Sequence, residues 1–360
     1  MPYITSIGLA VPENRFEQQQ IADFMAAALR LDAPNQRKLK ALYRSTKIQY
    51  RHSVLADYGL QPGAFSFYPN TEDLEPFPTT SQRMEAYRNF ALPLALKAAQ
   101  NCLSALPNPA ITHIITVSCT GLYAPGLDIE LVQALGLAGS TQRTAINFMG
   151  CYGAFNGLKI AQAIVKADAN AQVLVLCLEL CTLHFQKTLK DDYLLSNALF
   201  ADGAAAVLVE ANPHQKALEM KEFCCELMPE GKQDMAWQVA DHGFEMILSS
   251  YIPNLVKSSI KALTDKLLLA NQTFDFYAIH PGGRAILEGI EQAIGINKND
   301  NRFAYQVLAE YGNMSSCTVL FVLQKLWQEL RTKDHQKQVL SCAFGPGLTL
   351  ETMKLEIFVG

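Results

Sequence analysis

Short apolar runs alternate with longer amphipathic patterns along this chain. Four runs rich in β-branched and aliphatic residues predict buried strands at 113–118, 171–180, 204–210 and 274–280. The length and apolar spacing of 154–167 and 314–330 predict helices, and a further helix is expected at about 283–294. Strands alternating with helices in this way are typical of a mixed α/β architecture.

Two similar junctions, one in each half of the chain, suggest a duplicated unit. In the first half, a strand and a polar link are followed by TAINFMGC, which leads into a helix. In the second half, the strand FYAIH and a helix are followed by FAYQVLAEYGN, which again leads into a helix. We place the break near 211–217 and expect two halves, 1–212 and 213–360. The polar segment from about 30 to 90, interrupted by prolines, is expected to form an irregular helical insertion.

Composition excludes several classes of protein. The 360 residues are 49% apolar and 18% charged, which suits a large buried core. A formal charge of −4, without a strongly basic stretch, argues against a nucleic-acid partner. The apolar runs are too short to span a membrane, and the first residues do not resemble a signal peptide. The nine cysteines contain no CxxC pair, so we expect reduced thiols, no metal site and a cytoplasmic location.

Cys151 is the first candidate for chemistry. It lies in NFMGCYGAFNGL (147–158), at the end of an expected strand and the start of a helix. A thiol at a helix N-terminus lies in positive potential, which favours the thiolate. The structural alternative is a buried cysteine in front of a tightly packed helix.

A histidine and an asparagine also lie at the ends of predicted elements. His280 follows the strand FDFYAIH and precedes Pro-Gly-Gly, at the edge where α/β proteins bind ligands. Asn313, in EYGNMSSCTVLFVL, lies just before a helix, where an ordinary N-cap is the alternative. A surface turn is the alternative for His280. Taken together, Cys151, His280 and Asn313 form a plausible nucleophilic set.

Six segments carry a resemblance to a known family: YITSIGLAVPENR, GCYGAFNGL, NALFADGAAAVL, IHPGGRAIL, YGNMSSCTVLFVL and CAFGPGLTLET (342–352). They resemble the chalcone synthase-like type III polyketide synthases, in a form that looks bacterial. The resemblance implies a thiolase-like fold, a duplicated five-layer αβαβα core, in a homodimer. It also implies an acyltransferase that uses acyl-CoA and malonyl-CoA, with no cofactor, metal or carrier protein.

The resemblance also assigns roles. Cys151 matches the nucleophile that a starter acyl-CoA acylates, and His280 matches the base that holds it as a thiolate. Asn313 matches the amide that, with His280, hydrogen-bonds the malonyl-CoA thioester oxygen while carbon dioxide leaves. The enolate then attacks the acyl-Cys151 thioester, and the extended chain cyclises to a pyrone, a resorcinol or a related phenolic.

The cavity and CoA residues depart in part from the family pattern. Phe200 matches one gate residue, and Met246 replaces the second gate phenylalanine. Trp237 stands where chalcone synthase has glycine. The other cavity positions are Cys119, Cys181 and His184 in place of threonines, Ser315, and the loop residues Gly345, Pro346 and Gly347. For the CoA phosphates, Lys38 matches the family, two partners appear as Ala41 and Ser45, and Arg44 and Lys47 are candidate substitutes. The cavity is therefore expected to differ from that of a chalcone producer.

Other functions remain as alternatives. An initiating ketoacyl-carrier-protein synthase shares the Cys, His and Asn set, but a basic patch for the carrier protein and a different loop are expected there. A hydroxymethylglutaryl-CoA synthase needs a differently placed catalytic glutamate. A papain-like protease has the same residue order, but the sequence around Cys151 does not fit. A non-catalytic acyl-binding relative has no reason to keep all three residues. The starter, the number of extensions and the mode of ring closure are left open.

Overall fold

Strands from both halves of the chain build the main sheet. The computed structural model describes residues 1–360 except 105, 107–108, 214, 233, 250–251 and 268–272. The first half contributes β1 (Tyr3–Ala10), β4 (His113–Ser118), β5 (Gln142–Asn147), β6 (Val173–Leu180) and β7 (Asp202–Glu210). The second half contributes β8 (Lys216–Leu227), β11 (Phe276–Ile279), β12 (Gln338–Gly345) and β13 (Thr349–Val359). Their order is β11-β12-β13-β8-β1-β7-β6-β4-β5.

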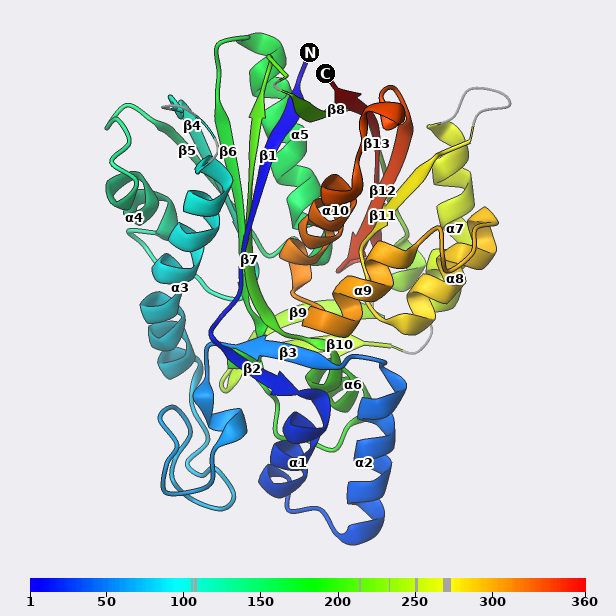
Figure 1. The fold of residues 1–360 in the computed structure, drawn as a ribbon. Helices are drawn as coiled ribbons and strands as arrows, with labels where there is room; N and C mark the ends of the chain where they lie inside the picture. Colours follow the sequence, from blue (N-terminus) through cyan, green and yellow to red (C-terminus); the bar gives the residue numbers. More distant parts are fainter. Residues whose placement is uncertain (105, 107–108, 214, 233, 250–251, 268–272) are drawn as a thin grey trace.

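Helices lie on both sides of these strands and between them. The first half contributes α3 (Thr80–Leu103), α4 (Leu127–Ala134), α5 (Gly153–Ala167) and α6 (Asp191–Leu199). The second half contributes α7 (Ile252–Lys266), α8 (Arg284–Ile294), α9 (Arg302–Tyr311) and α10 (Thr318–Glu329). Figure 1 shows five layers from left to right: α3 and α4, the first-half strands, α5 and α10, the second-half strands, and α7 with α8. Large apolar clusters fill the spaces between neighbouring layers.

The two sets of strands repeat one topology. Numbered in chain order within each half, the first-half strands are arranged 3-2-4-5-1. In the second half, α9 occupies the chain position of the third strand within the described residues; when the number 3 is left out for this reason, the four strands follow 2-4-5-1. The halves meet where β1 pairs with β8, through Tyr3 with Glu219 and Ile4 with Leu218. The thiolase-like fold inferred from the resemblance is confirmed by this architecture and by the comparisons below.

The predicted elements agree with the structure, with two exceptions. Residues 302–311, treated as equivalent to the strand before Cys151, form helix α9, so the two junctions differ. The segment 30–90 is more regular than expected. It contains α2 (Ala33–Ser45), β3 (Tyr50–Ser53) and the start of α3, where Thr79 and Gln82 form a capping box.

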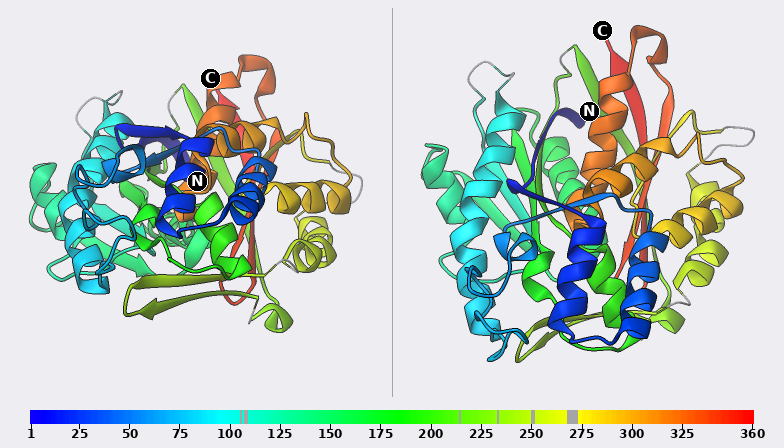
Figure 2. Two further views of the ribbon diagram at one scale, coloured as in Figure 1. Left: turned by 90° about the horizontal axis from the view of Figure 1, so that it is seen from below. Right: turned by 60° about the horizontal axis from the view of Figure 1, so that its bottom comes forward.

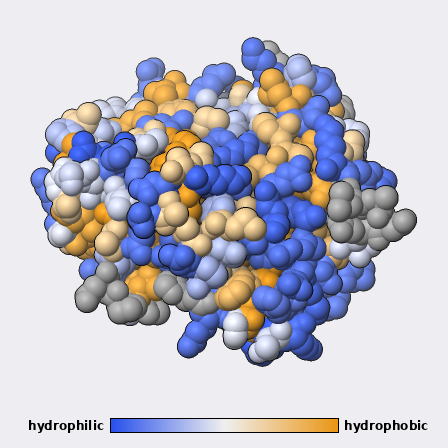
Figure 3. Space-filling model, turned by 90° about the horizontal axis from the view of Figure 1, so that it is seen from above, coloured by the Kyte–Doolittle hydropathy of each residue, from blue (hydrophilic) through white to orange (hydrophobic). Residues whose placement is uncertain are grey.

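The remaining elements gather at the lower end of the molecule. They are β2 (Asn14–Glu17), α1 (Gln18–Ala28) and the hairpin of β9 (Met235–Ala240) and β10 (Gly243–Leu248). In Figure 2, α1, α2 and α6 lie together below the sheets, and the hairpin crosses near them. Seen from above, the opposite face has apolar residues in separate groups among hydrophilic ones (Figure 3). Within the described part of the chain, no helix is both long and apolar enough to cross a bilayer.

Candidate active site

The turn that carries Cys151 is tightly constrained. Cys151 is 4% exposed and lies in a short 3₁₀ helix, Gly150–Tyr152, between β5 and α5. Gly150 has φ +77°, and a Cβ there would come within 2.1 Å of Cδ of Pro346. The Gly150 N–H donates to Sγ of Cys119 at 2.9 Å. Only glycine fits this position without a shift, and the turn fixes the place of Cys151.

His280 lies at the end of β11, fully buried, and its two ring nitrogens have no hydrogen-bond partner among the described residues. Its backbone N–H donates to the carbonyl of Cys342 at 2.8 Å. Its ring packs edge-on against Phe344, with centroids 5.4 Å apart. A Cβ on Gly345, the next residue, would come within 3.2 Å of the Cys151 nitrogen. The end of β12 therefore touches both the histidine and the nucleophile turn.

The Asn313 side chain lies beside Cys151 and close to Gly282, two residues after His280. Its Oδ1 accepts the N–H of Ser315 at 2.8 Å, and its Nδ2 lies 3.4 Å from the carbonyl of Gly282. Hydrogen bonds from the Asn313 and Ser315 side chains lower the pKa of the Cys151 thiol. The structure thus places Asn313 beside Cys151, and the end of β12 and the Gly282 segment connect His280 to the same region.

Burial sets the charge state of the two titrating groups. It raises the pKa of Cys151 to about 12, although the hydrogen bonds with Ser315 and Asn313 act in the opposite direction. It also lowers the pKa of His280 to about 3. The start of α5 does not by itself produce a thiolate, because desolvation outweighs the favourable potential. At neutral pH the resting pair is a neutral thiol and a neutral imidazole.

Glu179 is a buried acid that the sequence reasoning missed. It lies on β6 and is 0% exposed, and burial raises its pKa to about 7. Its carboxylate accepts hydrogen bonds from Oγ of Ser316 (2.5 Å), the N–H of Cys119 (3.0 Å) and Oγ1 of Thr120 (2.9 Å). The available signal was a lone glutamate in the otherwise apolar strand VLVLCLEL. Its charge also raises the pKa of Cys151.

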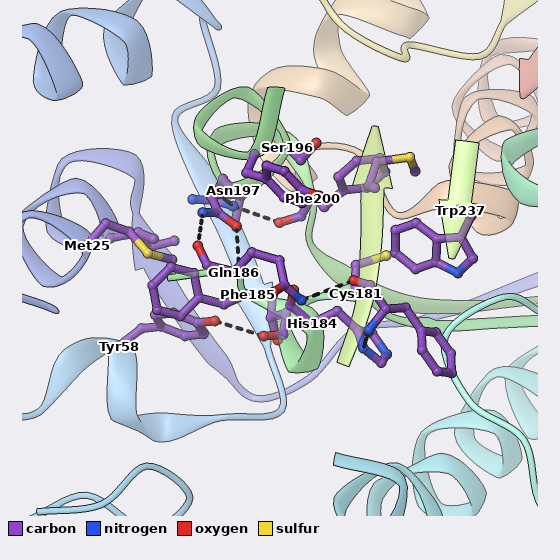
Figure 4. Close-up of a pocket in the computed structure, with 16 residues that line it drawn as sticks. Met25, Tyr58, Cys181, His184, Phe185, Gln186, Ser196, Asn197, Phe200 and Trp237 are labelled. Atoms are coloured by element: carbon purple, nitrogen blue, oxygen red, sulfur yellow. Dashed lines mark hydrogen bonds between the residues drawn. The ribbon is translucent and has the colours of Figure 1, made fainter. Parts of the chain in front are cut away.

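A buried pocket gathers five of the predicted cavity residues: Phe200, Met246, Trp237, Cys181 and His184 (Figure 4). The sequence reasoning missed its far wall, which includes Ile21, Met25, Arg51, Tyr58 and Phe185. The free space is about 40 Å³, which holds only a few water molecules. Side chains therefore fill most of this pocket.

Trp237 and His184 close one side of the pocket. The Trp237 indole N–H donates to the Cys119 carbonyl at 2.8 Å, and Trp237 lies opposite Met246 on the β9–β10 hairpin. His184 stacks on Phe244 with centroids 4.3 Å apart. Its Nδ1 accepts the Phe244 N–H, so Nε2 carries the proton and donates to the carbonyl of Thr120. Burial lowers the pKa of His184 to about 3, so the ring is uncharged at neutral pH where it lines the pocket.

The other predicted cavity residues lie elsewhere around the site. Cys119, Ser315, Gly345 and Pro346 contact the Cys151 turn or its hydrogen-bond partners, as described above. Gly347 lies farther along the loop, where its N–H donates to the Met235 carbonyl of β9 at 3.0 Å. These five positions do not line the pocket that contains Trp237.

A second, open groove reaches Gly282, two residues after His280. Its free volume is about 350 Å³, and its lining includes Thr46, Leu199, Gly282, Gly283 and Arg284. The groove is mostly apolar where it passes between α2, α6 and α8. Arg284 was not among the sequence candidates, and it forms an ion pair with Glu288 on the same helix.

The basic candidates for CoA do not converge on this groove. Lys38, Arg44 and Lys47 are all exposed. Lys38 is seven residues before Ser45 on α2, so it shares the face of α2 that borders the groove. Arg44 instead lines a separate depression with Glu17 and Tyr43. Within the described residues, no group of three His, Cys, Asp or Glu side chains is placed to hold a metal ion.

Comparison with known proteins gives matches over nearly the whole chain. The family models for chalcone and stilbene synthases match with the N-terminal domain at residues 2–213 and the C-terminal domain at 219–358. The alpha-pyrone synthesis polyketide synthase-like Pks18 of Mycobacterium tuberculosis is 29% identical, over 98% of this chain and 91% of that protein. Probable polyketide synthase 1 of Dictyostelium discoideum is 30% identical over 97% of this chain, which spans 11% of that protein's length. The crystal structure of the C-terminal type III polyketide synthase domain of Steely1 from Dictyostelium has a TM-score of 0.90, 28% identity and 99% coverage of both chains.

Proposed function

The chain belongs to the chalcone and stilbene synthase family of type III polyketide synthases, and we propose how its own residues carry out the condensation. Enzymes of this family are acyltransferases that use acyl-CoA and malonyl-CoA, generally without a cofactor. The observation that carries the assignment of residues is the buried His280 ring, whose nitrogens have no partner among the described residues, while Asn313 lies beside Cys151 and bonds the carbonyl of Gly282, two residues after His280. A buried polar ring without partners is costly, and a substrate oxygen or a thiol proton would satisfy it.

The first step is acylation of Cys151. His280 takes the thiol proton, and the sulfur attacks the thioester carbonyl of the acyl-CoA starter. The carbon–sulfur bond to CoA breaks, and the proton leaves with the CoA thiol. Either charge alone is strongly disfavoured by burial, but the thiolate and the imidazolium stabilise each other when they form together.

The second step is decarboxylation of malonyl-CoA. N–H groups of His280 and Asn313 hydrogen-bond the malonyl thioester oxygen, which becomes negative as carbon dioxide leaves. The Asn313 orientation supports this role, because Oδ1 accepts the Ser315 N–H, which fixes Nδ2 as the donor end of the amide; one of its two N–H groups lies toward the Gly282 carbonyl and the other is the proposed donor. The enolate carbon then attacks the acyl-Cys151 carbonyl. A carbon–carbon bond forms, the carbon–sulfur bond to Cys151 breaks, and the chain is two carbons longer.

The open groove is the proposed path of the CoA arm. Its apolar lining at Leu199 and its close backbone approach at Gly282 and Gly283 suit a thin pantetheine chain. Arg284 lines the groove and Lys38 lies on the face of α2 that borders it, and these two residues are the proposed phosphate contacts. Free CoA thioesters, and not carrier-protein thioesters, are the proposed substrates.

The small pocket favours a short product. Trp237 and His184 leave little room for a long folded intermediate beside Cys151. A short polyketide closes to a lactone without folding its carbon chain into a six-carbon ring, so we propose that the product is an α-pyrone. The name of the Mycobacterium tuberculosis relative, which refers to alpha-pyrone synthesis, supports the same product class.

A homodimer is proposed from the free edge of the sheet. β5 is the last strand of the order, and residues 142–145 are exposed although the neighbouring strand β4 is buried. An unpaired edge strand presents free N–H and C=O groups. Antiparallel pairing with the same strand of a second copy satisfies them with twofold symmetry.

The test offers the purified protein malonyl-CoA with acetyl-, medium-chain, long-chain and aromatic acyl-CoA starters, without carrier protein. We expect pyrones by mass spectrometry, formed by wild type and not by Cys151→Ala. Resorcinols would overturn the proposed ring closure but keep the condensing mechanism. If no product forms from CoA thioesters but product forms from malonyl-carrier protein, the proposed substrates are wrong and an initiating ketoacyl-carrier-protein synthase is favoured.

A further inference from the structure

The carboxyl end of α6 is held by groups from distant parts of the chain. The last carbonyls of a helix have no partner within it, and water usually satisfies some of them. Here every carbonyl of residues 196–200 accepts a hydrogen bond from the protein. Nη1 of Arg51 donates to two of them, those of Asn197 (2.8 Å) and Phe200 (2.7 Å).

Two other residues complete this set of hydrogen bonds. Nε2 of Gln18 donates to the carbonyl of Ala198 at 2.7 Å. The backbone N–H of Asn313 donates to the carbonyl of Leu199 at 2.9 Å. The residue assigned to the oxyanion site is therefore tied through its backbone to the helix end that carries the gate residue Phe200.

Arg51 and Gln18 form one unit. Nε of Arg51 donates to Oε1 of Gln18 at 2.8 Å, and both side chains are buried, at 3% and 5% exposure. The stem of Arg51 lies against Gly312, where a Cβ would come within 3.0 Å of Cγ of Arg51. Gly312 has φ +73° and directly precedes Asn313. Arg51 therefore contacts both sides of the junction between α6 and the Asn313 segment.

The same unit reaches the groove proposed for CoA. Nε2 of Gln18 lies 3.2 Å from Oγ1 of Thr46, which ends α2 and lines that groove. A cation at the C-terminal end of α6 is also favourable for the helix dipole. A chain of direct hydrogen bonds through Gln18 and Arg51 therefore connects Thr46 at the groove with the carbonyl of the gate residue Phe200.

We propose that Arg51, together with Gln18, is a positioning residue that holds Phe200 and Asn313 in their working geometry. The proposal rests on the function proposed above, since it assumes that Phe200 and Asn313 act in condensation. Arg51 acts through the two carbonyls and the Gly312 contact and does not touch the reacting atoms. Displacement of the helix end moves the gate and the oxyanion donor together.

The first test is Arg51→Lys. A lysine keeps the charge but loses the planar set of N–H groups that serves Gln18, Asn197 and Phe200 at once. We expect kcat for polyketide formation to fall about tenfold, with KM for the acyl-CoA changed less than about threefold. Decarboxylation of malonyl-CoA, followed as carbon dioxide release, should fall with it.

A double-mutant cycle separates positioning from general loss of stability. If Arg51 acts through the gate, Arg51→Lys in a Phe200→Ala background should cost less than about threefold in kcat. Gln18→Met is the second variant, in case Arg51→Lys does not fold, and we expect a kcat loss of about fivefold from it. Asp334→Ala is the matched control, because it removes a buried capping carboxylate, 4% exposed, far from α6.

The outcomes are distinct. The inference is overturned if folded Arg51→Lys and Gln18→Met lose no more kcat than Asp334→Ala. Independent, multiplying effects of Arg51→Lys and Phe200→Ala, together with an unchanged rate of malonyl-CoA decarboxylation in Arg51→Lys, overturn it as well. A wild-type protein that makes no polyketide from CoA thioesters overturns the proposed function and this inference with it, whereas an active wild type with unaffected variants overturns this inference alone.

Discussion

Gly150→Ala is predicted to displace the turn that carries Cys151 and so to lower kcat by more than its loss of stability explains. The backbone at this position has φ +77°, which costs an alanine about 1–2 kcal/mol. In addition, the new Cβ would lie 2.1 Å from Cδ of Pro346, where ordinary contact begins at 3.4 Å. One side must therefore give way by 1.3 Å (3.4 minus 2.1). The proline ring is joined to its own backbone and cannot swing aside, so the turn that carries Cys151 moves.

The expected result is a large loss of rate. A misplacement of about 1 Å at a reacting group costs about 100-fold, so kcat should fall by about this factor. Product formation from acyl-CoA and malonyl-CoA, measured by liquid chromatography and mass spectrometry, gives the rate, and urea unfolding gives the stability.

Gly295→Ala is the control for Gly150→Ala. Gly295 has φ +75° at the end of α8, and a Cβ there meets nothing within 4 Å. This variant should lose about 1–2 kcal/mol of stability and keep kcat within about twofold of wild type. The reasoning is refuted if Gly150→Ala loses no more rate than Gly295→Ala.

Three further predictions follow from the site. Trp237→Gly removes the indole that closes the pocket, and products from the same starter should become longer in mass spectra; an unchanged product profile would remove Trp237 from the specificity residues. Burial raises the pKa of Glu179 in the native state to about 7 from 4.5, so the native state disfavours the charged form. The free energy of unfolding therefore falls as pH rises from 4.5 to 7, by about 3 kcal/mol at most. Urea unfolding at pH 5 and pH 8 should show a smaller fall for Glu179→Gln, and an equal fall would contradict the assignment. His280→Gln cannot accept the thiol proton, so alkylation of Cys151 by iodoacetamide at pH 7.5 should slow at least about tenfold; an unchanged rate would contradict the role of base.

The main layers were predictable because their residues follow simple periods. β4 and α5 matched the predicted ranges to within a residue, since an unbroken apolar strand and a regular helix leave few alternatives. The helical state of 302–311 was missed. Its buried residues, Phe303, Ala304, Val307 and Leu308, have the i, i+1, i+4, i+5 spacing of a helix face, a signal that the comparison with TAINFMGC passed over.

The site was predictable in its residues but not in its charge state. The motifs identified Cys151 and His280, but their pKa values depend on desolvation by residues far apart in the chain. Glu179 left one local signal, its position in an apolar strand, but its partners and those of Arg51 are distant in sequence. Arg51, for example, bonds carbonyls about 150 positions away. Such contacts follow from the folded arrangement and leave no local pattern.

The central claim is that Cys151 carries the acyl chain. The direct measurement is to incubate the protein with an acyl-CoA starter alone, and then determine its intact mass and the modified peptide by mass spectrometry. The account predicts one acyl group per chain on the peptide that contains Cys151, and none on Cys151→Ala. An acyl group on another cysteine, such as Cys119 or Cys181, or product formation by Cys151→Ala, would contradict it.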